Sequence, residues 1–142
     1  MSKIIVSACL LGENCKYSGG NNYDPKVMEF IQGREVIPVC PEVLAGLGIP
    51  RTPMEIVNGV LVDKNGNVPD EKVRKAVAQI LEQLKTEDVE CVILKSRSPT
   101  CGVHHIYDGT FTGTVIEGSG VLAQALISAG YTVMDNEDLE ET

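Results

Sequence analysis

The sequence contains no tryptophan, and its 142 residues include only four tyrosines and two phenylalanines. Hydrophobic residues still make up 43% of the chain, an ordinary share for a soluble protein, so we expect a mostly aliphatic core. Basic residues are also few, because 12 lysines and arginines stand against 20 acidic residues and leave a net charge of −8. Neutralising nucleic-acid phosphates requires clustered basic side chains, so this charge argues against nucleic acid as a partner and favours a small ligand.

Several targeting and metal-binding patterns are missing as well. No run approaches the roughly 20 apolar residues of a membrane span, and the first residues lack the apolar region of a signal peptide, so we expect a cytoplasmic protein. The five cysteines include no Cys-x-x-Cys pair, which excludes the common zinc-ribbon and thioredoxin patterns. In a reducing compartment, an odd number of cysteines also argues against a disulfide framework. Without repeats or linkers, residues 1–142 are predicted to form a single domain.

What is present is an alternation of strand and helix patterns. A strand at residues 3–9, a helix from Asp24 to about residue 32 and a strand at 35–39 predict a βαβ unit, which is normally parallel and right-handed. The later elements are predicted as a hairpin over residues 55–63, a helix over 69–86, a strand at 90–94, a helix over 120–129 and a strand at 131–134. The sequence therefore predicts an α/β protein with a three-layer Rossmann-like fold, a mainly parallel sheet and a small β-hairpin insertion.

Local signals specify the turn of the hairpin and the start of one helix, while one segment has no predicted secondary structure. Asn58-Gly59 between two apolar runs is the strongest short hairpin signal, and Ser119 is predicted to cap the helix over 120–129. Residues 103–118 are predicted to be a long connection, and connections of this length usually serve function.

Three cysteines follow strand patterns at equivalent places. Cys9, Cys40 and Cys101 come at or just past the ends of apolar runs, and carboxyl ends of parallel strands meet at one edge of a sheet. We therefore expect these three thiols to converge in one crevice. Cys91 begins a strand and is predicted to be a core residue, whereas Cys15, in the first loop, is either a fourth ligand or a partly exposed thiol.

Three converging thiolates favour a soft metal centre, and two types remain open at this point. Zinc would be held by three cysteines and a water, whereas a cubane iron–sulfur cluster held by three cysteines leaves one iron free for a sulfur atom of the substrate. Glu42, two residues past Cys40, and Ser98, three residues before Cys101, are suited to acid–base chemistry. The alternative interpretations are a first-turn carboxylate for Glu42 and a turn residue before proline for Ser98.

These motifs together resemble the DUF523 family over nearly the whole chain. The matching blocks are Ser7-Ala8-Cys9-Leu10-Leu11-Gly12 with Lys16-Tyr17, Val39-Cys40-Pro41-Glu42, Gly48-Ile49-Pro50-Arg51, and Ser96-Arg97-Ser98-Pro99-Thr100-Cys101-Gly102 with Ile106-Tyr107-Asp108-Gly109-Thr110-Phe111. The family includes thiouracil desulfidases, so the resemblance implies a [4Fe-4S] cluster held by Cys9, Cys40 and Cys101. It also implies Glu42 and Ser98 as catalytic residues. The implied reaction is non-redox hydrolysis of the C–S bond of a thiolated pyrimidine, giving a uracil-type product and hydrogen sulfide.

Two other functions remain as alternatives. The first is a zinc-dependent hydrolase whose metal is held by the three cysteines, or by cysteine together with His104 or His105; the sequence lacks the His-x-Glu and Cys-x-x-Cys pairing of zinc deaminases. The second is a non-catalytic module that holds a small ligand or a sulfur-carrying partner at the same three-cysteine site.

Overall fold

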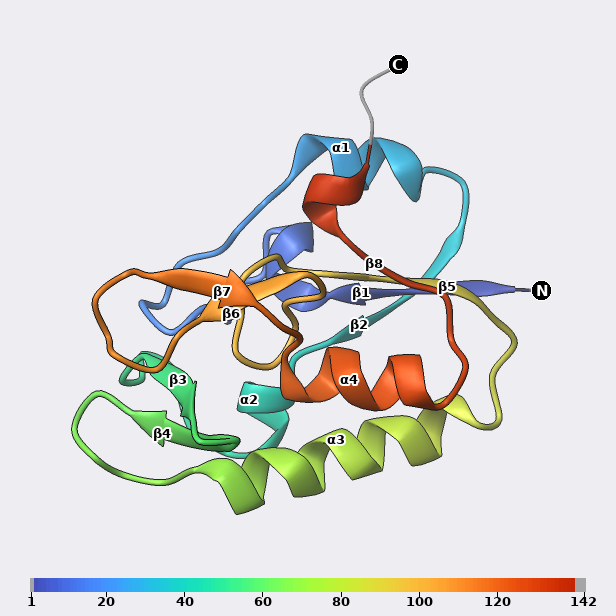
Figure 1. Cartoon of the computed structure of the whole chain (residues 1–142). Coiled ribbons are helices and arrows are strands. Elements are labelled where there is room, and N and C mark those ends of the chain that lie inside the picture. The colour runs from blue at the N-terminus through green and yellow to red at the C-terminus, as the bar shows by residue number, and fades with distance from the viewer. Residues whose placement is uncertain (1, 140–142) are drawn as a thin grey trace.

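A computed structural model describes residues 2–139 of the chain. Its centre is a four-stranded, fully parallel sheet in the order β2-β1-β5-β8, formed by β1 (Lys3–Ser7), β2 (Glu35–Val39), β5 (Val89–Leu94) and β8 (Val133–Asp135). Four α-helices are described: α1 (Pro25–Phe30), α2 (Pro41–Leu44), α3 (Asp70–Leu84) and α4 (Val121–Ser128). Helix α1 lies on one face of the sheet, and α3 and α4 lie on the other (Figure 1). The predicted three-layer α/β fold with a mainly parallel sheet is confirmed.

The central strands are buried on both faces, so their apolar runs are continuous rather than alternating with polar residues. Successive side chains still point to opposite faces. Ile5, Val92 and Leu94 join the core under α3 and α4, while Ile4, Cys91 and Ile93 join the core under α1. The prediction that Cys91 is a core residue is confirmed, and this thiol lies away from the carboxyl ends of the strands.

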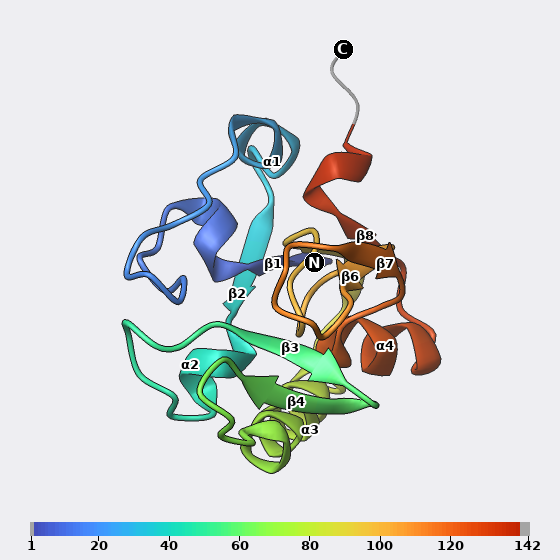
Figure 2. The ribbon, with the colours of Figure 1, turned by 60° about the vertical axis from the view of Figure 1, so that its left-hand side comes forward.

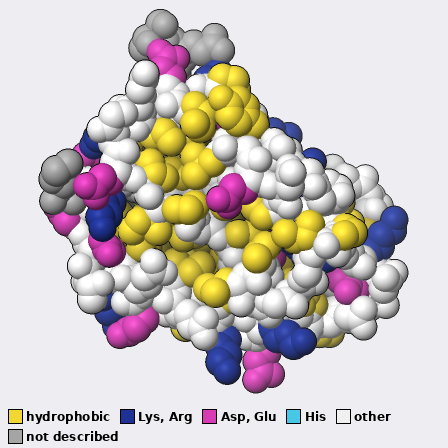
Figure 3. All heavy atoms as spheres, turned by 180° about the vertical axis from the view of Figure 1, so that it is seen from behind, with side chains coloured by type: hydrophobic (Ala, Val, Ile, Leu, Met, Phe, Trp, Pro, Cys, Tyr) yellow, Lys and Arg dark blue, Asp and Glu magenta, His cyan; other side chains and the backbone are white. Residues whose placement is uncertain are grey.

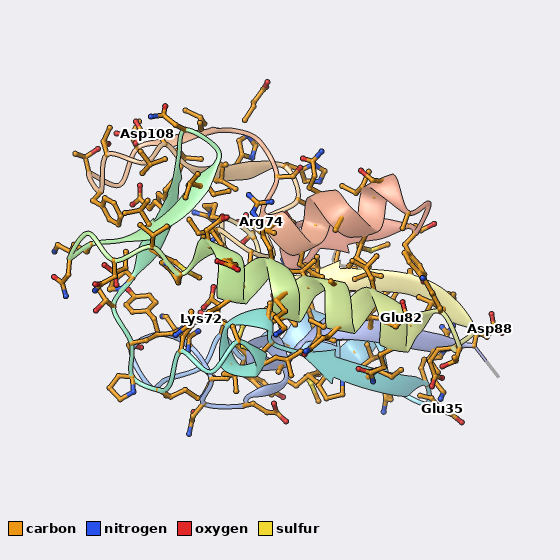
Figure 4. All side chains as sticks on the ribbon, turned by 90° about the horizontal axis from the view of Figure 1, so that it is seen from below. Glu35, Lys72, Arg74, Glu82, Asp88 and Asp108 are labelled. Carbon is orange, nitrogen blue, oxygen red and sulfur yellow. The ribbon has the colours of Figure 1, made fainter. Side chains whose placement is uncertain are left out.

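Helix boundaries follow the local chemistry of the sequence. The side chain of Asp24 accepts a hydrogen bond from the backbone N–H of Lys26, which caps α1 ahead of Pro25. In α3 the apolar face is buried, whereas Arg74 and Glu82 lie on the exposed face (Figure 4). This distribution is the one expected of an amphipathic helix that covers a sheet.

Two hairpins flank the carboxyl ends of the sheet strands. The predicted one is formed by β3 (Met54–Val57) and β4 (Val60–Asp63), with Asn58 and Gly59 at φ of 50° and 80°, as a tight turn between twisted strands requires. The second, formed by β6 (His105–Tyr107) and β7 (Val115–Glu117), occupies the segment that the sequence predicted only as a connection. The strands of the sheet run from the N-terminus towards these hairpins, and Figure 2 brings this end forward.

Buried Glu55 ties the two hairpins together. Its Oε1 accepts hydrogen bonds from the backbone N–H groups of Gly109, at 2.9 Å, and Phe111, at 3.2 Å. Glycine is required at position 109, because φ is +92° and a Cβ there would lie 2.6 Å from the carbonyl oxygen of Ile56.

The predicted cap of α4 is wrong. Ser119 donates its hydroxyl hydrogen to the carbonyl of Val103 instead, and Gly120 occupies the N-cap position. The first N–H groups of α4 are satisfied by backbone carbonyls of a neighbouring loop: Val121 donates to Pro99, and Leu122 and Ala123 donate to Thr100. Helix α4 therefore holds the loop that follows β5.

The surface adds two observations. The back of the molecule carries a broken patch of hydrophobic side chains with charged residues around it (Figure 3). None of the helices within residues 2–139 combines the length and the apolar character that crossing a membrane requires.

Candidate active site

The three cysteines lie at the carboxyl ends of three adjacent strands of the sheet. Cys9 is in the 3-10 helix η1 (Ala8–Leu11) directly after β1, and Cys40 is the N-cap of α2 directly after β2. Cys101 lies in the loop after β5, which we call the Ser96–Gly102 loop. All three line one cavity of about 560 Å³. The predicted convergence of these residues at one edge of the sheet is thus present in the structure.

Both predicted acid–base residues line the same cavity. Glu42 lies in the first turn of α2, and Ser98 lies in the Ser96–Gly102 loop. Both residues also have the structural roles named as alternatives, because Glu42 is a first-turn carboxylate of α2 and Ser98 accepts hydrogen bonds within its own turn.

Cys15 also lines the cavity, with 8% of its surface exposed, so the alternative of a partly exposed loop thiol is wrong. Burial raises the pKa of its thiol to about 12, and the neighbouring Cys40 and Cys9 add to the rise. Cys15 is thus a fourth thiol of the cavity, placed beside Cys40.

The thiol of Cys9 has a hydrogen-bond donor, and the thiol of Cys101 lies beside the hydroxyls of Ser7 and Thr100. The side-chain amide of Asn22 donates to Cys9 Sγ at 3.3 Å, and the hydroxyl of Thr100 lies 3.6 Å from Cys101 Sγ. Burial raises the pKa of both thiols, to about 12 for Cys101. Hydrogen bonding to Asn22 opposes the rise at Cys9, and hydrogen bonding to Ser7, followed by Thr100, opposes it at Cys101. A positively charged metal centre is the partner that stabilises buried thiolates of this kind.

The spacing of the sulfur atoms bears on the type of metal. A tetrahedral zinc ion with Zn–S bonds of about 2.3 Å holds its sulfur ligands about 3.8 Å apart. Within residues 2–139, the one group of three Cys, His, Asp or Glu residues whose ligand atoms all lie within 4.8 Å of one another is His104, Asp135 and Asp138, outside the cavity. Among the described residues, no three of the cavity thiols therefore have all their sulfur atoms as close together as a single zinc ion would hold them.

Neither histidine belongs to the cavity lining. His104 Nε2 hydrogen-bonds the carboxylate of Asp138, at 2.8 and 3.0 Å, and His105 is an exposed residue of β6. A zinc site completed by His104 or His105 is therefore not formed in this structure.

Arg51 fixes the carboxylate of Glu42. Its Nε and Nη2 both donate to Glu42 Oε2, with the Nε contact at 3.0 Å, and Nη2 also donates to the carbonyl of Cys15 at 2.9 Å. The side chains of Arg51 and Glu42 are 7% and 13% exposed. The pair leaves the second carboxylate oxygen, Oε1, facing Thr100, whose hydroxyl donates to it at 3.2 Å.

Ser98 organises its own loop. Its Oγ accepts hydrogen bonds from the backbone N–H groups of Thr100, at 3.2 Å, and Cys101, at 3.1 Å. Close packing of the backbone fixes the same loop, because a Cβ at Gly102 would lie 2.8 Å from the carbonyl oxygen of Ser98. The serine and the cysteine are thereby held in one rigid turn.

Lys95 brings a basic group to the lining of the same cavity. Its Nζ donates to the carbonyl oxygen and the hydroxyl of Ser96, at 2.9 and 3.1 Å. Burial lowers the pKa of Lys95, and the neighbouring charge of Arg97 lowers it further.

Sequence reasoning missed four residues that shape this site: Asn22, Arg51, Lys95 and Thr100. Arg51 and Thr100 lie inside the motif blocks quoted above, so their position was a usable signal, although no role followed from it. Asn22 lies in a loop rich in glycine and asparagine, where nothing in the sequence distinguishes it from its neighbours.

Comparison with known proteins places these features in context. A family model described as 2-thiouracil desulfurase matches residues 4–138. An uncharacterized protein of Bacillus subtilis (strain 168), YbbK, is 36% identical over 148 residues, which cover 97% of this chain and 98% of YbbK. The solved structure of a [4Fe-4S]-dependent thiouracil desulfidase, TudS (DUF523Vcz), is similar over 98% of this chain and 93% of its own, with a TM-score of 0.90 and 31% identity.

Proposed function

Because the chain belongs to the 2-thiouracil desulfurase family, we propose that it removes sulfur from a small thiolated pyrimidine with the help of a [4Fe-4S] cluster. The reaction balances without an oxidant or a reductant. The thiocarbonyl compound and water give the carbonyl compound and hydrogen sulfide. The observation that carries this proposal is the convergence of Cys9, Cys40 and Cys101 on one cavity that also contains Glu42 and Ser98.

The donor set of the cavity fits such a cluster. Cys9, Cys40 and Cys101 offer thiolate sulfur, the ligand type that iron–sulfur clusters require, and they come from three separate strand ends around one cavity. We assign these three residues as its ligands. When bound, the cluster supplies Lewis-acid iron chemistry suited to a thiocarbonyl sulfur.

The side chains around the cavity suggest how the rest of the reaction is divided. Glu42, held by Arg51, is assigned as the base that takes up the proton of the attacking water, and Ser98 as the hydroxyl that contacts this water. Tyr107 and Phe111, from the segment of the second hairpin, provide apolar surface for a flat ring. Because the cavity holds about 560 Å³, it is large enough for a pyrimidine.

The test is anaerobic reconstitution followed by iron, sulfide and turnover measurements. We expect about four irons per chain and release of sulfide from 2-thiouracil or 4-thiouracil, with thiouridine and its nucleotide as further substrates to compare. Cys9→Ser, Cys40→Ser and Cys101→Ser should each lose the cluster, because each removes one thiolate ligand. Cys91→Ala is the matched control, since this buried cysteine belongs to the core under α1 and should leave the iron content unchanged.

Three outcomes would contradict the proposal. Full iron content in all three serine variants would show that the ligands are assigned wrongly. Zinc in place of iron in protein purified without oxygen would favour the zinc hydrolase, although no three described cavity thiols have all their sulfur atoms within 4.8 Å of one another. A loaded cluster without turnover of any thiolated pyrimidine would favour the non-catalytic binding module.

A further inference from the structure

Phe111 has a backbone conformation that is unfavourable for a residue of its size. Its φ is +58°, in the left-handed region, where the Cβ of a residue other than glycine crowds the backbone. Within residues 2–139, the other non-glycine residues with positive φ are Asn58, in the tight turn between β3 and β4, and Arg97. Asparagine tolerates this region, whereas an aromatic residue there is a genuine outlier, and such outliers are concentrated at binding and catalytic sites.

The carboxylate of Glu55 holds this conformation. Residues 108–114 join β6 to β7, and Glu55 Oε1 accepts from the backbone N–H groups of both Gly109 and Phe111. Because both N–H groups are directed at one oxygen atom, the chain must bend tightly between them, and φ is +92° at Gly109. Glu55 is only 9% exposed, so water competes little with these charge-assisted hydrogen bonds. A residue of the first hairpin thus stabilises the unfavourable conformation in the second.

The same turn also has hydrogen bonds of its own. Asp108 Oδ1 accepts from the N–H and the hydroxyl of Thr110, at 2.9 and 2.6 Å, and the N–H of Asp108 donates to the carbonyl of Thr114 at 2.9 Å. The turn is therefore fixed both by Glu55 and by its own residues. Phe111 accordingly has its position before any ligand enters, which lowers the entropy cost of binding.

Phe111 belongs to the lining of the cavity that contains the three thiols. Of the chain's four tyrosines and two phenylalanines, Tyr17, Tyr107 and Phe111 line this cavity. Aromatic side chains provide flat apolar surface on which a planar base can stack. Of these three residues, Phe111 alone has a positive φ, whereas Tyr17 is 44% exposed, with the Lys16 ammonium 5.8 Å from the centre of its ring. The backbone conformation thus points to Phe111 as the ring partner.

We propose that Phe111 is the residue on which the pyrimidine ring stacks, and that Glu55 is the positioning residue that holds Phe111 in place. This inference rests on the proposed function, which supplies the pyrimidine. A ring that stacks on Phe111 through its face keeps its edge, with the sulfur atom, free for the other groups of the cavity. Because stacking is present in the ground state and in the transition state alike, it acts on affinity more than on the rate constant.

The direct test compares uracil with dihydrouracil as ligands of the reconstituted holoenzyme. The two compounds share their carbonyl and N–H groups, but the ring of dihydrouracil is neither flat nor aromatic. In equilibrium dialysis, the wild-type protein should bind uracil about tenfold more tightly, and Phe111→Ala should reduce this preference to less than about twofold. Phe30→Ala is the matched control, because Phe30 lies on α1, away from the residues that line the cavity, and should leave the preference unchanged.

Glu55 is tested by Glu55→Leu against Glu55→Gln at equal iron content. Leucine removes the acceptor, so the preference for uracil should be lost as in Phe111→Ala. KM for 2-thiouracil should rise about tenfold while kcat changes less than about threefold. Glutamine keeps an oxygen acceptor for both N–H groups and should restore KM and uracil binding to within about threefold.

Thermal unfolding gives a check that needs no ligand. Glycine adopts positive φ freely, so Phe111→Gly should have a Tm at least as high as that of Phe111→Ala, although glycine usually destabilises a fixed backbone. A lower Tm for Phe111→Gly would show that position 111 is not held in the left-handed region, and the role of Glu55 would be overturned.

The remaining outcomes separate the stacking from the proposed function. Equal binding of uracil and dihydrouracil by the wild-type protein, or an undiminished preference in Phe111→Ala, would overturn the stacking. Glu55→Leu with wild-type KM and uracil binding would overturn the positioning. A loaded wild-type protein that prefers uracil but releases no sulfide from thiolated pyrimidines would support the stacking and contradict the proposed function.

Discussion

At the scale of single residues, the site depends on one buried ion pair. Arg51 donates to Glu42 Oε2 through two nitrogens and also to the carbonyl oxygens of Cys15 and Gly48, at 2.9 and 3.2 Å. A planar guanidinium can donate to a carboxylate and to two carbonyl oxygens at the same time, and the single ammonium group of a lysine cannot reproduce this geometry. The same arginine therefore fixes the carboxylate and anchors the first loop of the chain beside it.

Removing Arg51 should expose the dependence of Glu42 on its partner. Arg51→Met leaves a buried carboxylate unpaired, and we expect a loss of about 3 kcal/mol in the free energy of unfolding, measured by urea denaturation. Lys85→Met is the matched control, because Lys85 pairs with Glu82 on an exposed helix face and should cost less than about 0.5 kcal/mol. The double variant Glu42→Gln/Arg51→Met should lose less than the sum of the single changes. Equal small losses in Arg51→Met and Lys85→Met would contradict the importance of this pair.

The sequence predicts a residue of the site when that residue follows a parallel strand, because the carboxyl ends of parallel strands lie at one edge of the sheet. Cys9, Cys40 and Cys101 follow apolar runs, and parallel strands bring their ends together whatever the loops do. Asn22 and Arg51 act through contacts with residues that are distant in sequence, at Cys9 and at Glu42. Such contacts depend on the conformation of irregular loops, which follow no periodic pattern.

At the scale of secondary-structure elements, the Ser96–Gly102 loop and helix α4 form one unit. The amino end of α4 donates its free N–H groups to the carbonyls of Pro99 and Thr100, and the N–H of Gly120 donates to Gly102 at 2.7 Å. The backbones approach so closely that a Cβ at Gly120 would lie 2.5 Å from the carbonyl carbon of Thr100. The helix is thus a support for the loop that carries Ser98 and Cys101.

This close approach gives a steric test. Gly120→Ala should force the two backbones apart and cost about 1–3 kcal/mol of unfolding free energy, with a lower iron content after reconstitution. Gly20→Ala is the matched control, because the nearest atom to a Cβ there is Ser18 Oγ at 3.5 Å, and its effect should stay within about 0.5 kcal/mol. Equal stability of the two variants in urea denaturation would mean that the loop and the helix are not held against each other.

The elements differ in how well the sequence predicted them. The long helix α3 and the hairpin around Asn58-Gly59 follow strong periodic and turn signals, and both are confirmed. The hairpin of β6 and β7 was missed, because its strands are only three residues long and the residues between them are rich in glycine and threonine. The cap at Ser119 was predicted wrongly because the donors of α4 are satisfied by another segment of the chain, which no local pattern reveals.

At the scale of the whole molecule, the short helix η2 (Asn136–Asp138) joins segments from distant parts of the chain. Asn136 accepts a hydrogen bond from the N–H of Ser96 and donates one to the carboxylate of Asp24, at 2.9 and 3.0 Å. Glu137 pairs with Arg97 at 2.6 Å, and Asp138 pairs with His104. Three consecutive residues thereby hold both ends of the segment that contains Ser98, Thr100 and Cys101.

The pair of His104 and Asp138 makes the stability of the fold depend on pH. Hydrogen bonding to Asp138 raises the pKa of His104, and the charges of Asp138 and Asp135 add to the rise. A raised pKa means that the folded state binds the proton more tightly. The pair therefore stabilises the fold fully below about pH 6.5, and this contribution is lost as the pH rises through the raised pKa.

His104→Gln should accordingly lower Tm more at about pH 6 than at about pH 9. The difference should be small, about 0.5 kcal/mol at most, because the pair is half exposed and screened by solvent. His105→Gln, a change at an exposed position next to it, should show no such dependence on pH. Calorimetry at both pH values provides the measurement, and an equal loss at both would show that the proton plays no part.

The position of η2 in the chain has a consequence for biosynthesis. Residues 136–138 leave the ribosome after Cys9, Cys40 and Cys101, so a nascent chain presents its three thiols before Ser96 and Asp24 are held by Asn136. If the inorganic centre were assembled while the chain is still on the ribosome, the loops around the pocket would not yet be held by Asn136. The order of synthesis favours delivery of iron and sulfide to a finished, already folded polypeptide.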